Sequence, residues 1–81
     1  MLHARQDYQE RIQDSENKIP EDEPVFLIRA QDVNAPEIVR YWAELAENYG
    51  AEDNILTAAR AHSERMVEWQ RQHGMKIPDM P

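Results

Sequence analysis

The second half of the chain carries apolar side chains at the spacing of α-helices. Between Asn34 and Gly50 they follow a 4-3-4 spacing, at Ile38, Trp42, Leu45 and Tyr49, and Val39 and Ala46 widen this stripe. Between Asp53 and Gly74 the corresponding stripe has a 4-3-4-3-4 spacing, at Ile55, Ala59, His62, Met66, Trp69 and His73, with Leu56 alongside. Such spacing places side chains on one face of a helix. Because only a few residues join the two segments, the pattern predicts an antiparallel helical hairpin.

Residues that favour the ends of helices flank both segments. Asn34 is expected to be the N-cap of the first helix, since Pro36 and Glu37 follow it at first-turn positions. Asp53 is expected to cap the second helix. A glycine follows each segment and is expected to end it. The expected fold class is therefore mainly α.

The first half of the chain is less regular. Within residues 2–15 only Tyr8 and Ile12 share a helix face, which predicts a weak, mobile N-terminal helix inside residues 1–17. Residues 15–24 contain two prolines and four carboxylates, a composition typical of a linker. Residues 75–81 are expected to form an extended tail.

Four consecutive apolar residues, Val25 to Ile28, stand immediately before the polar sequence Arg29-Ala30-Gln31-Asp32. They could form a short strand or one turn of helix, because short apolar runs do not distinguish the two. A strand would have to pair with the N-terminal segment, the tail or another copy of the chain. We expect the run to be buried, which would place its polar neighbours at the rim of the core.

Size and charge restrict the class of protein. Residues 1–81 are long enough for a single small domain. Its core is expected to supply only a few kcal/mol, which favours a homo-oligomer. Sixteen acidic and nine basic residues give a net charge of −7 with no basic segment, so direct nucleic-acid binding is not expected. No apolar run reaches the ~20 residues that a bilayer requires, and we expect a cytoplasmic protein.

The sequence offers little for catalysis. The three histidines are far apart and match no zinc motif, and there is no cysteine. Ser63 follows His62 directly, but neighbours on a helix point about 100° apart and do not form a nucleophile–base pair easily. We therefore expect a protein that is not an enzyme and uses no cofactor or metal.

A candidate ligand site lies around the polar sequence that follows the apolar run. Arginine suits a carboxylate or phosphate, and an indole can stack on a base. The proposed ligand-binding residues are Arg29, Gln31, Asp32, Arg40 and Trp42. The alternative is structural: Arg29 pairs with Asp32, and Asp32 or Gln31 holds the turn before the helix.

The string Lys18-Ile-Pro-Glu-Asp-Glu-Pro-Val-Phe-Leu-Ile-Arg-Ala-Gln-Asp32, with Ala35-Pro36 and Trp42-Ala43 after it, resembles a group of small bacteriophage and prophage proteins. The resemblance covers about residues 18–73. It implies an accessory protein that acts on the host, as a stoichiometric binder, in the host cytoplasm. No site residue carries over from it.

Two hypotheses follow for function. In the first, the protein is a non-enzymatic phage accessory protein that binds, and sequesters, a small anionic metabolite or nucleotide signal as a homo-oligomer. In the second, it is an acidic protein–protein inhibitor or adaptor that docks on a basic host protein, in the manner of a nucleic-acid mimic or host-defence antagonist. The second rests on the net charge and on Glu37, Glu44, Glu47 and Glu64.

Overall fold

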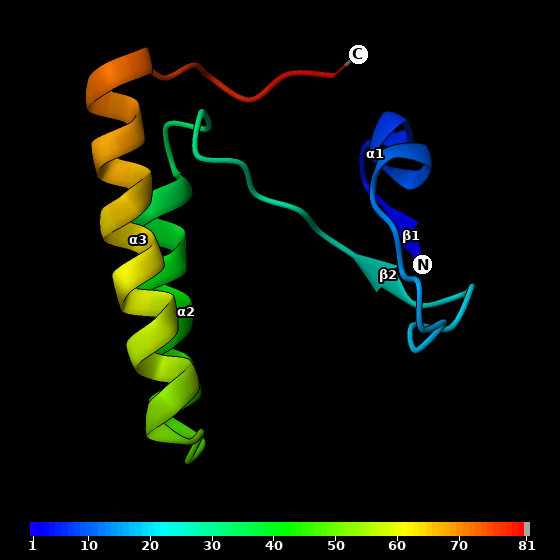
Figure 1. Ribbon diagram of the computed structural model, residues 1–81, viewed down its shortest axis with the longest axis horizontal. Coiled ribbons are helices and arrows are strands. Elements are labelled where there is room, and N and C mark those ends of the chain that lie inside the picture. Colours follow the sequence, from blue (N-terminus) through cyan, green and yellow to red (C-terminus); the bar gives the residue numbers. More distant parts are fainter. Residues whose placement is uncertain (81) are drawn as a thin grey trace. The chain divides into compact units, whose positions relative to one another are not determined.

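The computed structural model describes residues 1–80 and confirms the mainly α class (Figure 1). The helices are α1 (Gln6–Arg11), α2 (Ala35–Asn48) and α3 (Asp53–His73), and the strands are β1 (Leu2–His3) and β2 (Pro24–Val25). Where one domain was expected over residues 1–81, the chain divides into two compact units. One unit is Arg29–Pro78, and the other contains residues 1–28 with Asp79 and Met80.

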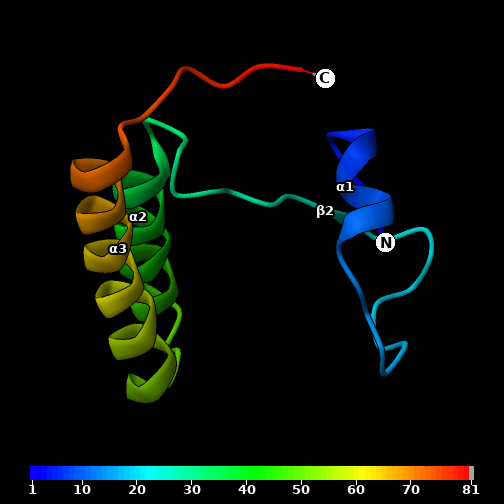
Figure 2. The ribbon, with the colours of Figure 1, turned by 45° about the horizontal axis from the view of Figure 1, so that its top comes forward.

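In the unit Arg29–Pro78, α2 and α3 lie side by side (Figures 1 and 2). Helix α2 begins directly after Asn34, as predicted, but Asn34 does not cap it with its side chain. The Asp32 carboxylate instead accepts a hydrogen bond from the Asn34 N–H at 2.8 Å. Asn34 already has helical backbone angles, so its side chain is not placed as an N-cap side chain is.

The ends of the two long helices are close to those predicted. Helix α2 ends at Asn48, and Gly50 follows with φ of +85°, while Gly74 ends α3 with φ of +83°. Positive φ is tolerated by glycine because it has no Cβ atom. Helix α3 starts one residue earlier than expected, so Asp53 is its first residue and Glu52 takes the N-cap position.

The helix faces that pack together agree only in part with the predicted stripes, because Met66 and Leu56 are buried and Ala59 is half-buried, as the stripe on the second helix predicts. The buried residues are Ala35, Pro36 and Ala43 on α2, and Leu56, Ser63 and Met66 on α3. The largest side chains of the predicted stripes lie about 100° away around each helix: Trp42 is 49% exposed and Ile55 47% exposed. We call these packed faces the seam. The small side chains of Ala35, Ala43 and Ser63 allow the two helices to approach closely, and Leu56 and Met66 are buried with them.

The unit that begins at the N-terminus contains the shorter elements. The predicted N-terminal helix is limited to Gln6–Arg11, because Ile12 is already extended. Tyr8 is buried, and the guanidinium groups of Arg5 and Arg11 lie 4.8 and 5.9 Å from the centre of its ring. Strands β1 and β2 pair in parallel, so the N-terminal segment is the partner of the apolar run.

The apolar run itself is not buried as predicted. Only Val25 belongs to β2, and Phe26 and Leu27 are 73% and 40% exposed. The partner strand is two residues long, and its Leu2 is itself 46% exposed. So short a strand pair provides no layer of side chains that could cover the run.

The remaining segments are irregular, as expected. Residues 15–23 form no helix or strand, and the Asp14 carboxylate accepts hydrogen bonds from the N–H groups of Lys18 and Ile19. Residues 75–80 of the tail contain no helix, and Pro81 lies outside the described residues. No helix in residues 1–80 combines the length and the apolar character needed to cross a bilayer.

Candidate functional site

The turn that contains the predicted ligand residues is held from two sides. The Gln70 side chain on α3 donates hydrogen bonds to the carbonyl oxygens of Ala30 and Asp32, both at 2.9 Å. On the tail, the Lys76 N–H donates to the Gln31 carbonyl at 2.8 Å, and the Val33 N–H donates to the Lys76 carbonyl at 3.0 Å. The turn is therefore fixed to both the end of α3 and the tail.

This geometry gives Gln31 and Asp32 structural roles. Both residues are half-buried, and the Asp32 carboxylate holds the Asn34 N–H, as the structural alternative predicted. The Arg29–Asp32 ion pair of that alternative does not form. Arg29 is exposed, and its guanidinium makes no hydrogen bond or ion pair within residues 1–80.

The other two predicted ligand residues are not brought together. Arg40 and Trp42 are both exposed on α2. Residues two apart on a helix point about 200° apart, so they do not share a face. Arg40 lies on the side of Glu37 and Glu44, whereas Trp42 lies on the side of Ile38 and Leu45.

Sequence reasoning missed Gln70 and Ser63 as seam residues. Ser63 is 1% exposed and its hydroxyl donates to the Arg60 carbonyl at 2.6 Å. A signal was present, because the less exposed residues of α3 recur at a 3-4-3-4 spacing, at Leu56, Ala59, Ser63, Met66 and Gln70. Spacing alone predicts the neighbouring stripe through Ile55 and Trp69 instead, because its side chains are larger and more apolar.

Large apolar side chains remain exposed on both long helices. On α2, Ile38 is 43%, Trp42 49% and Leu45 42% exposed. On α3, Ile55 is 47% and Trp69 38% exposed, and Trp69 stacks on His73 with ring centres 4.4 Å apart. A contiguous exposed apolar patch commonly marks an interaction site.

Charged side chains lie elsewhere on the same helices. One ion pair joins them, from Arg60 on α3 to Glu47 on α2 at 3.4 Å. Glu37, Glu44 and Glu64 are exposed and make no ion pair within the part of the chain that the structure describes. On α2 the exposed Glu37 and Glu44 lie about 100° from Ile38 and Leu45, and the exposed Tyr41 lies between the two groups.

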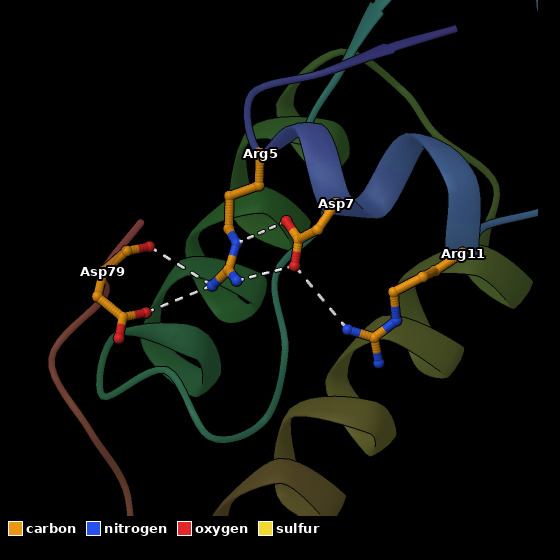
Figure 3. Close-up of polar contacts among 4 residues, drawn as sticks. All are labelled: Arg5, Asp7, Arg11 and Asp79. Carbon is orange, nitrogen blue, oxygen red and sulfur yellow. Dashed lines mark hydrogen bonds and ion pairs between the residues drawn. The ribbon is translucent and has the colours of Figure 1, made fainter. Parts of the chain in front are cut away.

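A cluster of ion pairs stands at the start of α1 (Figure 3). The Arg5 guanidinium donates two hydrogen bonds to the Asp7 carboxylate, at 3.0 and 2.9 Å, and one to the Asp79 carboxylate at 3.3 Å. These hydrogen bonds lower the pKa of the Asp7 carboxyl below its ordinary value and raise the pKa of Arg5. Three donor groups of Arg5 already bond to carboxylates, so Arg5 is not available to bind an anion. We call the cluster of Arg5, Asp7 and Asp79 the clasp, because it stabilises the fold around the start of α1.

The clasp makes the N-terminal unit sensitive to acid. The pKa of Asp7 is lower in the folded chain than in the unfolded one, so the clasp stabilises the fold above the ordinary carboxyl pKa. That contribution is lost as the pH falls through the folded value. NMR titration of the carboxyl carbons is expected to show a pKa of Asp7 below the ordinary aspartate value, and the signals of α1 changing as Asp7 is protonated. A Glu10→Gln variant should keep the acid transition, and Asp7→Asn should remove it. Loss of structure at α1 with Asp7 still ionised would contradict the role of the clasp.

The described residues contain no group of three histidine, cysteine, aspartate or glutamate side chains that could hold a metal ion. Fold and surface together define a small, acidic, mainly helical protein with exposed apolar stripes. No family model, curated protein or solved structure matches the chain.

Proposed function

We propose that the protein is a non-enzymatic, homo-oligomeric interaction protein, an adaptor or inhibitor that docks on a basic partner protein through exposed carboxylates. In this proposal α2 and α3 form an antiparallel helical hairpin that serves as a rigid platform. The resemblance to phage proteins supports a host protein as the partner. The observation that carries the proposal is the surplus of carboxylates that no cation of the chain neutralises.

That surplus is greatest near the N-terminus. Residues 1–28 contain seven acidic and three basic side chains, a net charge of −4. All three basic side chains are already paired: Arg5 and Arg11 with Asp7, and Lys18 with Glu16. The consecutive carboxylates Glu21, Asp22 and Glu23 are exposed and have no such partner within residues 1–80. They are therefore free to meet cations of another protein.

A basic partner would meet several such carboxylates at once. Single exposed ion pairs contribute about 0–1 kcal/mol, so binding requires many of them together. Charges of opposite sign also increase the rate at which two proteins meet, and salt reduces this effect. Docking by the mechanism proposed here must therefore weaken steeply as the salt concentration rises.

A pull-down from bacterial lysate at low and high salt tests this proposal. Replacing Glu21, Asp22 and Glu23 by their amides is expected to abolish the captured band, because it removes carboxylates that have no cation in the chain. A matched variant neutralises the paired carboxylates Glu16, Glu47 and Glu68 and changes the net charge equally. It is expected to keep most of the binding. Capture that is insensitive to salt, or that both variants reduce alike, would count against docking through free carboxylates.

Binding of a small anionic metabolite or nucleotide has less support. Its one favourable observation is the Arg29 guanidinium, which makes no hydrogen bond or ion pair within the described chain. Against it, the Asp32 carboxylate is bonded to the Asn34 N–H, and Arg40 and Trp42 lie on different sides of α2.

A further inference from the structure

We propose that the exposed apolar stripes of α2 and α3 form one face, which binds the same face of a second copy to give a dimeric four-helix bundle. The proposal rests on the homo-oligomer and the antiparallel hairpin proposed above, and it names the surface and the partner. The face consists of Ile38, Trp42 and Leu45 on α2 and Ile55, His62 and Trp69 on α3.

The two stripes stand in the same relation to the packed seam. On α2, Trp42 comes one residue before the buried Ala43, and on α3, His62 comes one residue before the buried Ser63. One residue is a rotation of about 100° around a helix. In an antiparallel pair, equal rotations on the two helices lead to the same side of the pair. The two apolar stripes therefore adjoin along one face.

An observed contact supports the rule that residues with equal offsets from the seam lie on the same side of the helix pair. Glu47 comes one residue after Ala46 of the seam, and Arg60 comes one residue after Ala59, so both are rotated in the opposite sense. Their side chains meet at 3.4 Å. Residues with equal offsets do reach the same side of the pair, and this side is the charged one. The apolar stripes then lie on the other side.

The charges of the chain favour a second copy on the apolar face. Each copy carries a net charge of −7, so most pairs of surfaces would bring carboxylates together. No carboxylate lies on this face; the one charged residue at the same offset from the seam is Arg65, directly before the buried Met66. Glu37, Glu44 and Glu47 point to the opposite side of α2 and would remain exposed in the dimer.

The thin core supplies the driving force. The seam buries small residues, Ala35, Ala43 and Ser63, together with Leu56 and Met66. A helix pair needs a second layer to bury its remaining apolar surface, and a four-helix bundle provides one. The large side chains of the face are 38–49% exposed, on the order of 500 Å² in each copy. Two copies would bury about 1,000 Å², near the lower limit for a specific interface.

Sedimentation velocity and light scattering on the full chain test the proposal. The unaltered chain is expected to be a dimer. Trp42→Lys should weaken association by roughly a hundredfold or more, because it places an ammonium group in an apolar interface. The control Glu44→Lys also introduces a lysine on α2, about 200° away from Trp42, and should leave the dimer intact. Circular dichroism checks that each variant keeps its helices.

Ile55→Lys provides a second variant on α3, should Trp42→Lys not fold. It is expected to give a folded monomer. A monomeric unaltered chain, or a dimer that survives both substitutions, would overturn the interface. Neither result affects docking through Glu21–Glu23, which the salt-dependent pull-down tests separately.

Discussion

Replacement of Leu56 by alanine is expected to lower the free energy of unfolding of the helix pair by about 2–5 kcal/mol, the usual cost of removing a buried leucine. Leu56 is 2% exposed and is the largest aliphatic side chain buried in the seam. A core of this size is worth only a few kcal/mol in total. The variant should therefore be largely unfolded at ambient temperature, as measured by far-UV circular dichroism and urea denaturation.

The matched control for this prediction is Leu27→Ala, which makes the same chemical change at a residue that is 40% exposed. It should change the unfolding of α2 and α3 by less than about 0.5 kcal/mol. Equal losses from the two variants would show that Leu56 does not pack in a close seam.

Replacement of Gln70 by alanine should have the second largest effect. Its amide provides a donor to the Ala30 carbonyl, and it shares the Asp32 carbonyl with the Ala35 N–H. Loss of a donor to a part-buried carbonyl costs about 1–3 kcal/mol. We expect this reduction in the free energy of unfolding, and faster hydrogen exchange at the amide of Asn34, because the turn before α2 is no longer held by α3.

Gln72→Ala is the control for Gln70, since the two residues lie on the same turn of α3. The Gln72 amide is exposed and donates to Glu68 at 3.1 Å, within the helix itself. Gln72→Ala should change the free energy of unfolding by less than about 0.5 kcal/mol, as most surface substitutions do. If Gln72→Ala matched Gln70→Ala, the effect would come from helix propensity rather than from fixing the turn.

The positions of the long helices could be predicted from local sequence alone. Their ends depend on short-range backbone preferences, and glycine at positions 50 and 74 takes up the positive φ that ends each helix. Asp32 could be expected to hold the turn before α2 for a similar reason, because aspartate bonds readily to the backbone N–H two residues on.

The apolar pattern identified the seam only in part. On α2 a stripe of small residues and a stripe of large ones lie about 100° apart, whereas on α3 the seam itself includes Leu56 and Met66. Hydrophobicity alone favours the large stripe, at Trp42 and Ile55. In the structure, the residues through Ala43 and Ser63 are buried instead, because close helix approach depends on the size of both facing surfaces.

In the candidate site too, some features follow from the local sequence and others only from tertiary contacts. The sequence by itself determined the charge, the helical segments and the polar turn at residues 29–32, which all follow from composition and neighbouring residues. Only the tertiary structure decided that Gln70 and Lys76 hold this turn and that Phe26 is exposed. Those outcomes depend on contacts between residues far apart in the chain, and the local spacing of residues does not determine which surfaces contact each other.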